Sequence, residues 1–304
     1  MNIRDLKYAV AVAELNHFGR AAEACRVSQP ALSGQIRKLE AHLGVVLFER
    51  TNKSVAVTPV GEEIIALGRE LLEVVERIEM TAAAHTDPLA GSLRLGMIHT
   101  IGPYLAPLLL PSIRRSLPKI DLQISEDVTA TLEDRLIAGD LDAALIATPV
   151  VEPRLTEIAL YDEPFWVALP HGHRLEHSEE IDVLDIATDE LLLLGDGHCL
   201  SDQVLSFCTK KPGKKPTSRT QQTSLTTILA LVGAGAGVTL VPAMSLMGPW
   251  VTDSGIAMRR EKSGLAGRAV RLVFRKSFPR QAVLEKLADI VCAILPDTVS
   301  PERR

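Results

Sequence analysis

The chain has 304 residues, a length that suits two or three domains. Its composition, 46% hydrophobic and 23% charged, excludes an intrinsically disordered chain, and the 4% aromatic content argues against a broad base-stacking surface. The net charge of −5 is unevenly distributed, because residues 1–57 carry 8 Lys and Arg against 5 Asp and Glu, while residues 58–88 carry 2 against 7. A small basic segment ahead of a neutral-to-acidic body is typical of a DNA-binding head.

The N-terminus and the cysteines indicate a protein of the cell interior. Residues 1–5 open directly into a mixed polar and apolar pattern, so we expect no export signal. Residues 220–252 carry no charge, but glycines and prolines interrupt them, which favours a buried helix followed by a buried strand over a membrane span. The cysteines at 25, 199, 208 and 292 lack both the density of a disulfide scaffold and zinc-finger spacing, and we expect no metal and no cofactor.

Residues 1–57 read as short helices followed by a wing. Small residues across 18–25 mark a helix that another helix can approach closely, and Ser28 is a good N-cap for the helix that follows. Apolar residues of that next helix repeat every three to four positions, at Leu32, Ile36, Leu39 and Leu43. Segments 47–50 and 54–57 then suggest a small hairpin.

The outer face of the helix that begins at Ser28 is polar and basic. Gln and Arg side chains can contact base edges at two points, while Ser and Lys can hold phosphates. An ordinary helical hairpin is the alternative, but the local positive charge favours DNA. The predicted DNA-binding residues are Ser28, Gln29, Pro30, Ser33, Gln35, Arg37, Lys38, Arg50 and Lys53.

A long helix is predicted from Thr58 to about His85, with Pro59 in its first turn. Its length, roughly 40 Å at 1.5 Å per residue, exceeds what a small head can cover. An apolar line runs along it, at Ile64, Leu67, Leu71, Val75 and Ile78. Because a helix from a second chain is the natural cover for such a line, we predict that residues 58–90 form a dimerising linker and hinge.

Strand and helix patterns alternate beyond the linker. Strands are predicted at 93–98, 121–125 and 142–147, with helices at 103–115 and 131–138, and this order predicts a parallel sheet with flanking helices. Later segments continue the pattern at 165–169, 191–194, 225–232, 238–241, 270–274 and 280–295. We predict an α/β regulatory domain over residues 91–304 with two lobes, lobe I at about 91–162 and 269–304 and lobe II at about 163–268.

Two of the four cysteines have surroundings that suggest chemistry. Cys199 follows a Gly-rich turn at a predicted helix start, where the backbone amides favour a thiolate, the form that attacks peroxide. A second thiol at Cys208 could trap the resulting sulfenic acid. The residues alone leave this interpretation and that of two unrelated cysteines equally open. Cys25 and Cys292 lie in apolar helical segments and are predicted to be structural.

The N-terminal motifs together resemble the LysR-type transcriptional regulators. The motifs that carry this similarity are Ala21-Ala22, Ser28-Gln29-Pro30-Ala31-Leu32-Ser33, Ile36-Arg37-Lys38-Leu39-Glu40, Leu47-Phe48-Glu49-Arg50 and Thr58-Pro59-Val60-Gly61. The resemblance continues over the rest of the chain. It implies a winged helix-turn-helix, a dimerising linker helix and a two-lobed α/β effector domain like periplasmic binding proteins. It further implies a homodimer or homotetramer that acts on double-stranded promoter DNA with RNA polymerase.

Residues 198–208 and 100–104 are similar to the peroxide-sensing members of that family. The similarity implies that hydrogen peroxide is the effector, that Cys199 is the peroxidatic thiol and that Cys208 is the resolving thiol. The neighbours that it implies for the peroxide site are Thr100, Thr129, His198, Asp202 and Arg275. His99 departs from the family pattern, which has proline there, and a Lys-rich segment at 210–215 is interpreted as a solvated loop.

These patterns predict a cytoplasmic, nucleoid-associated bacterial regulator that is not an enzyme. The resemblance implies that it controls oxidative-stress genes through a reversible Cys199–Cys208 disulfide, which a cellular thiol reductant of the glutaredoxin or thioredoxin type would reset. If residues 199–208 form one helix, its ends lie roughly 13 Å apart on opposite faces, whereas a disulfide needs Cα atoms within about 7 Å. The segment would then have to unfold before the bond forms.

Two alternatives remain at this point. One is a LysR-type regulator whose inducer is a small metabolite in the interlobe cleft. The other is a thiol peroxidase, against which the predicted DNA-binding head and the lack of a Cys-x-x-Cys pair both argue.

Overall fold

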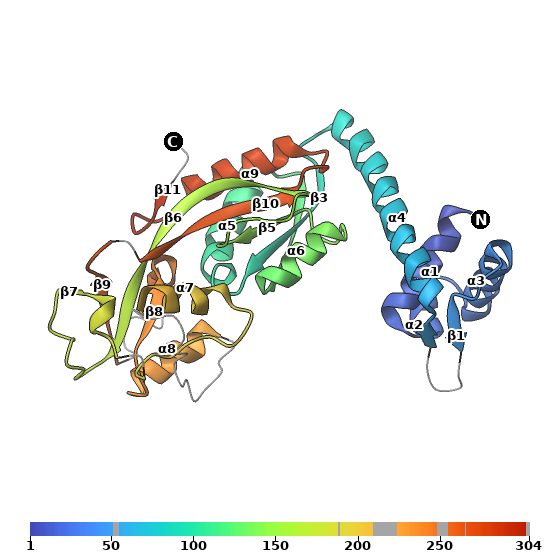
Figure 1. Ribbon diagram of the computed structural model, residues 1–304. Coiled ribbons are helices and arrows are strands. Elements are labelled where there is room, and N and C mark those ends of the chain that lie inside the picture. Colours follow the sequence, from blue (N-terminus) through green and yellow to red (C-terminus); the bar gives the residue numbers. More distant parts are fainter. Residues whose placement is uncertain (51–54, 188, 209–223, 248–254, 265, 302–304) are drawn as a thin grey trace. The chain divides into compact units, whose positions relative to one another are not determined.

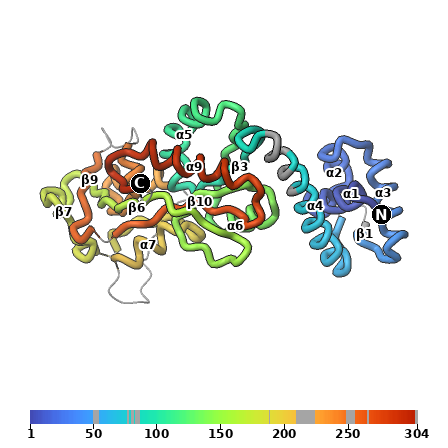
Figure 2. The backbone as a smooth tube through the Cα atoms, turned by 90° about the horizontal axis from the view of Figure 1, so that it is seen from above, coloured from blue at the N-terminus to red at the C-terminus, as the bar shows by residue number. Residues whose placement is uncertain are grey.

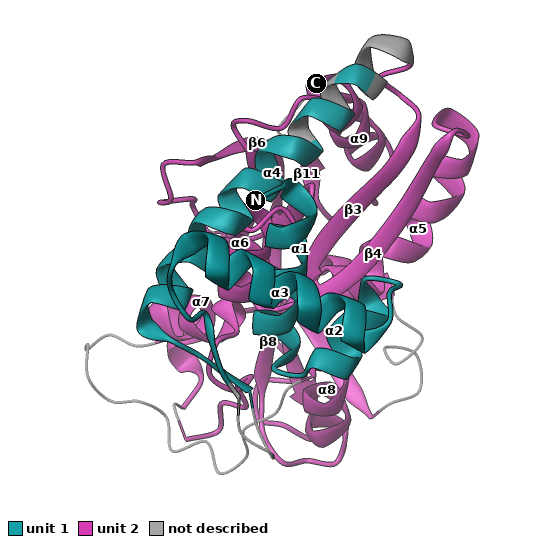
Figure 3. Ribbon diagram, turned by 90° about the vertical axis from the view of Figure 1, so that its right-hand side faces the viewer, with its two compact units in different colours: residues 1–85 teal, residues 86–304 magenta. Residues whose placement is uncertain are grey.

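The fold is described from a computed structural model of residues 1–304, apart from 51–54, 188, 209–223, 248–254, 265 and 302–304 (Figure 1). It divides into two compact units, residues 1–85 and 86–304 (Figure 3). The predicted linker helix therefore belongs to the same unit as the head. Lys53 and the Lys-rich loop at 210–215 lie outside the described residues.

The first unit is built on three short helices, α1 (Ile3–Leu15), α2 (Phe18–Ala24) and α3 (Gln29–Leu43). Their boundaries follow local capping, because the Asn2 side chain accepts from the Asp5 amide and the Ser28 side chain accepts from the Ala31 amide. The predicted apolar stripe of α3 is buried in the core of this unit at Leu32, Ile36 and Leu39. The predicted helix-turn-helix is confirmed.

A wing and the long helix complete this unit. Strand β1 (Phe48–Arg50) pairs antiparallel with β2 (Val55–Val57), as predicted, and the Glu40 carboxylate anchors the wing by accepting from the Leu47 and Phe48 amides at 2.9 and 3.3 Å. Helix α4 (Pro59–Thr86) then begins where the Thr58 hydroxyl accepts from the Gly61 amide at 3.0 Å.

The second unit contains a mixed sheet rather than the parallel sheet that the alternation predicted. Strand β3 (Gly91–Ile98) is parallel to β4 (Ile120–Asp127) and to β5 (Ala143–Ile146). Strand β10 (Gly267–Arg275) runs antiparallel between β5 and β6 (Leu155–Pro170). The prediction was wrong for β10 because strand direction depends on long-range pairing, which local periodicity does not report.

Strand β6 spans much of the second unit (Figure 2). Its first half pairs with β10, and its second half pairs with β8 (Thr239–Pro242) and β9 (Ile256–Glu261). The short strands β7 (Glu180–Ile181) and β11 (Ser300–Pro301) pair with β9 and β6. The predicted strand at 191–194 is reduced to one bridge between Leu191 and Val238.

The remaining helices flank this sheet. They are α5 (Gly102–Ser116), α6 (Thr129–Ile137), α7 (Cys199–Cys208), α8 (Leu225–Gly233) and α9 (Gln281–Ala293), with short 3₁₀ turns η1 (Val183–Asp185) and η2 (Ala243–Met247). Helix α8 followed by β8 confirms the predicted buried helix and strand. Over the described part of the chain, no helix is both long and apolar enough to cross a membrane.

Candidate functional site

Cys199 is the first residue of α7 and is half-buried. Gly197 precedes it with φ of 90°, a left-handed conformation that favours glycine and turns the chain into the helix. The Ser201 hydroxyl closes this turn by donating to the Leu194 carbonyl at 2.8 Å, and the Gln203 amide ties α7 to the end of β5 by donating to the Ala147 carbonyl at 2.7 Å. The first thiol is therefore fixed at a helix N-terminus, where a partial positive charge favours an anion.

A cavity of about 10 Å³ lies against Cys199, with room for about one water-sized molecule. The residues that line it are Ile98, His99, Thr100, Val128, Thr129, Gly197, His198, Cys199 and Leu200. The structure thus brings the predicted Thr100, Thr129 and His198 together around the thiol. The Thr129 hydroxyl and His99 Nδ1 are buried polar atoms with no hydrogen-bonding partner among the described residues. Because buried polar groups need partners, the cavity suits a small polar molecule.

Arg268, which the sequence reasoning missed, supports this cavity from β10. Its guanidinium donates to the Thr100 hydroxyl at 2.7 Å, to the Thr100 carbonyl at 3.0 Å and to the Glu163 carboxylate at 2.8 Å. Burial by itself lowers the pKa of Arg268, but Glu163 and then the anionic form of Cys199 raise it, so the net shift is upward. A permanent cation is therefore held within electrostatic reach of the Cys199 sulfur.

The structure places Arg275 and Asp202 differently from the prediction. Arg275 is buried and donates to the carbonyls of Leu136 and Leu141, the latter at 2.7 Å, so it does not line the cavity. It lies seven residues beyond Arg268 on β10, roughly 23 Å away at the rise of an extended strand. Asp202 is exposed in the first turn of α7 and is also outside the cavity lining. Of the two arginines on β10, the structure thus places Arg268, and not the predicted Arg275, in contact with a residue of this cavity.

Cys208, the last residue of α7, is buried with 6% of its surface exposed. Burial, and then the negative charge of Glu261, raise the pKa of its thiol to about 12. Beside it, the Phe207 ring packs edge-on against Phe165 with ring centroids 6.1 Å apart. The two predicted redox cysteines thus occupy opposite ends of one continuous helix.

The other two cysteines have structural surroundings. Cys25 is half-buried in the first unit, where burial raises the pKa of its thiol. Cys292, on α9, donates its S–H to the Leu160 carbonyl at 3.4 Å. Neither residue lines the cavity beside Cys199.

The outer face of α3 presents most of the predicted DNA-binding residues. Gln29, Pro30, Arg37 and Lys38 are exposed, and Ser33 is half-buried. Ser28 acts as the N-cap, while Gln35 donates to the Asp5 carboxylate at 2.7 Å and so joins α3 to α1. Arg50 ends strand β1 on the wing.

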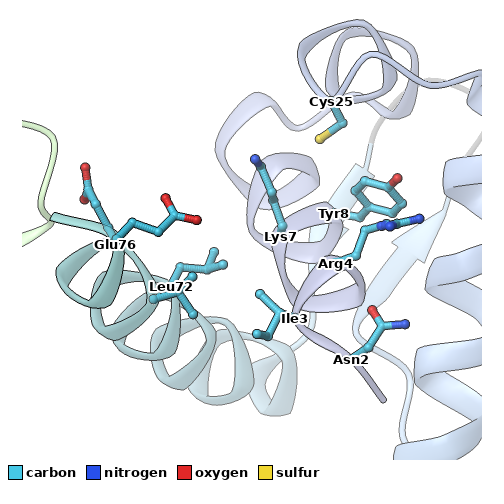
Figure 4. A pocket seen from close by; sticks show the side chains of 10 residues that line it. Asn2, Ile3, Arg4, Lys7, Tyr8, Cys25, Leu72 and Glu76 are labelled. Carbon is cyan, nitrogen blue, oxygen red and sulfur yellow. The ribbon is translucent and has the colours of Figure 1, made fainter. Parts of the chain in front are cut away.

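A groove of about 910 Å³ lies between α1 and α4 within the first unit. Figure 4 shows Ile3 and Lys7 of α1 facing Leu72 and Glu76 of α4 across it. On either side of these two residues of α4, Leu67 and Ile78 are each 64% exposed. This helix therefore carries apolar surface that the rest of its own unit leaves uncovered.

Comparison with known protein families assigns each of the two parts of the chain to a domain family. Residues 3–62 match the bacterial regulatory helix-turn-helix protein of the lysR family, and residues 86–293 match the LysR substrate binding domain. The chain belongs to the LysR family of DNA-binding transcription regulators, and it is not an enzyme.

Within that family the chain is similar to peroxide-responsive proteins. It is 38% identical over 300 residues to the hydrogen peroxide-inducible genes activator of Pectobacterium carotovorum, with 96% of each chain covered. Full-length OxyR from Pseudomonas aeruginosa, which carries a cysteine-to-aspartate substitution, has a similar structure, with a TM-score of 0.81. The two sequences are 38% identical, and the comparison covers 100% of this chain and 98% of that one. A Corynebacterium glutamicum OxyR cysteine-to-serine mutant with bound H₂O₂ has a TM-score of 0.65 and 36% identity, covering 96% of this chain and 92% of that one.

Proposed function

We propose that this protein is a transcription regulator that senses hydrogen peroxide through Cys199 and Cys208. The observation that carries the proposal is the cavity of about 10 Å³ that places Cys199, at the start of α7, beside polar groups without partners. The peroxide-responsive relatives support the same effector. We place its action in the cytoplasm at nucleoid DNA, where it controls oxidative-stress genes together with RNA polymerase.

The chemistry runs in two balanced steps. The Cys199 thiolate attacks one peroxide oxygen, the O–O bond breaks, and the departing hydroxide takes a proton to leave as water, so that Cys199 becomes a sulfenic acid. Arg268 stabilises the negative charge that develops in the cavity. The Cys208 thiol then loses its proton and attacks the Cys199 sulfur, the S–O bond breaks, and the departing hydroxide takes up that proton to leave as a second water while the disulfide forms. A cellular thiol reductant of the glutaredoxin or thioredoxin type resets the bond.

Helix α7 makes the second step a conformational switch. Nine residues separate the two cysteines, so their Cα atoms lie roughly 13 Å apart in the helix, while a disulfide requires about 7 Å or less. The helix must therefore open before the bond can form, and the covalent bond then holds the opened state. This change in the regulatory unit is the signal that alters DNA binding.

The decisive experiment is non-reducing peptide mapping of the full chain after one equivalent of peroxide. We expect a single crosslinked peptide pair containing Cys199 and Cys208, with Cys25 and Cys292 remaining as thiols. Absence of any oxidation at Cys199, together with a small metabolite that raises the melting temperature, would instead support an inducer-binding regulator. Many turnovers of peroxide per chain with a reductant would support a thiol peroxidase.

We propose that α3 reads promoter DNA through its exposed face. Gln29→Ala should weaken specific binding by about 1–3 kcal/mol if it removes a base contact, and Lys38→Ala should weaken binding to all sequences alike. Gln35→Ala is the matched comparison, because Gln35 is bonded to Asp5 and should affect stability more than sequence preference. Footprints that are unchanged in both Gln29→Ala and Lys38→Ala would contradict this assignment.

We also propose that a second copy of the chain covers α4 and that the regulator acts as a homodimer or homotetramer. Leu71 lies on the apolar line of α4, and an acid buried there without a partner would be costly. Leu71→Asp should therefore give monomers in sedimentation, whereas Glu70→Asp on the same helix should not. A soluble Leu71→Asp tetramer would refute the interface.

A further inference from the structure

His99 lies directly after β3 and lines the cavity beside Cys199. Its ring meets that of His198 edge-on, with centroids 5.4 Å apart and an interplanar angle of 65°. Its Nδ1 atom is buried and makes no hydrogen bond to any described residue. A second imidazole thus borders the space in which peroxide would react.

The unpartnered nitrogen points to a ligand in this cavity. A buried imidazole nitrogen is normally satisfied by protein or by a small molecule, and the adjacent cavity has room for about one water-sized molecule. The Thr129 hydroxyl on α6 is left without a partner at the same cavity. Two residues with unsatisfied polar atoms, one just after β3 and one on α6, therefore line the same small cavity.

The charged groups around this cavity determine whether His99 can accept and donate a proton. Those on the surrounding elements are His198 and Cys199 at the start of α7, Glu126 and Asp127 at the end of β4, Arg268 on β10, and Glu163 on β6, which is paired with Arg268. Burial first, and then the nearby His99, lower the pKa of His198. A positive charge on His99 therefore disfavours a proton on the neighbouring His198 ring.

We propose that His99 is a proton carrier in the peroxide step of this regulator, accepting the Cys199 thiol proton and donating it to the departing oxygen. The inference rests on the proposed function. One proton leaves sulfur, one S–O bond forms, the O–O bond breaks, and the same proton completes the departing water, so His99 ends the step in its starting state. The only oxidant is the peroxide itself.

The test measures the rate of sulfenic acid formation at Cys199 between pH 5 and 8.5, with dimedone capture, in full-length Cys208→Ser protein. With His99 present, the rate should fall toward the acidic end of this range, because an imidazole that already carries a proton cannot accept the thiol proton. His99→Asn keeps a polar side chain but does not titrate, so it should lower the rate at pH 7 about 100-fold and remove that step from the profile. His177→Asn, which changes an exposed histidine, is the matched control.

A rate within twofold of the parent, or a loss that is equal at every pH, would overturn the proposal and leave His99 as part of the cavity wall. His99→Gln provides a second polar variant if His99→Asn lowers the melting temperature. If the parent itself forms no sulfenic acid, the proposed peroxide sensing fails instead, so the two failures are distinguishable.

Discussion

The two ends of α7 present the same thiol group in opposite surroundings. Cys199 begins the helix beside a small polar cavity and within reach of the Arg268 guanidinium. Cys208 ends it in a buried position where the pKa of the thiol rises to about 12. A thiol that attacks peroxide must be accessible to it and must lie near positive charge. A thiol that attacks the resulting sulfenic acid can stay buried until the helix opens. Under the proposed function, the helix would therefore impose an order on the two steps, because the second thiol would become reactive only when α7 opens.

Removing either cysteine gives the largest expected effect and tests the comparison directly. Cys199→Ser should abolish the peroxide response and leave Cys208 unoxidised, since a buried thiol of raised pKa is a poor nucleophile. Cys208→Ser should still form a sulfenic acid at Cys199, lack the crosslink and over-oxidise more readily. Intact mass and peptide mapping after one equivalent of peroxide measure both outcomes.

The remaining cysteines supply the controls for that experiment. Cys25→Ser and Cys292→Ser should respond to peroxide like the parent, because neither thiol lines the cavity. A full response in Cys199→Ser, or a crosslink to Cys25 or Cys292, would show that Cys199 is not the thiol that attacks peroxide or that Cys208 is not its disulfide partner.

A smaller effect should follow from changing only the stability of α7. Ser206 is exposed, and its hydroxyl donates to the Gln203 carbonyl of the same helix at 2.6 Å. Glycine destabilises a helix interior by about 1 kcal/mol relative to alanine, which is about fivefold in the population of the opened helix. Ser206→Gly should therefore close the Cys199–Cys208 disulfide about fivefold faster than Ser206→Ala.

The Ser206 pair also separates the two chemical steps. Sulfenic acid formation at Cys199 should be equal in both variants, because the cavity lies at the other end of the helix. Rapid-quench mass spectrometry follows the two steps separately. Equal closure rates in Ser206→Gly and Ser206→Ala would mean that opening of α7 does not limit the disulfide.

Local patterns in the sequence were sufficient to predict the helices of the first unit and the start of α7. Caps at Ser28 and Thr58 and the three-to-four-residue apolar repeat set the helices of the first unit, and each of these signals acts within one turn of its helix. The same kind of signal placed a helix start at Cys199. Exposure along α3 was less predictable, because Gln35 lies off the apolar stripe yet bonds to Asp5 thirty residues away.

The supporting shell of the cavity could not be predicted from local patterns. Arg268 reaches Glu163 and Thr100 across 105 and 168 positions of sequence, and nothing within β10 distinguishes it from Arg275. The two arginines reach different partners because they sit at opposite ends of β10, and that placement follows from pairing with β5 and β6. Strand pairing over long distances therefore decides both the direction of the sheet and which arginine contacts the cavity beside Cys199.

The smallest expected effect is a pH dependence of stability that comes from Cys208. Its pKa of about 12 in the folded protein lies above the ordinary thiol value of 9.0, so its contribution to stability is fully present below about pH 9 and is lost as the pH rises toward 12. Ionisation thus favours the opened helix. In full-length Cys199→Ser protein, raising the pH from 8 to 9.5 should lower the melting temperature about 2 °C more when Cys208 is present than in Cys208→Ala. The other titrating groups are common to both proteins, so the difference isolates this thiol. Parallel melting curves across that range would show that the Cys208 end of α7 is as open to solvent as the Cys199 end.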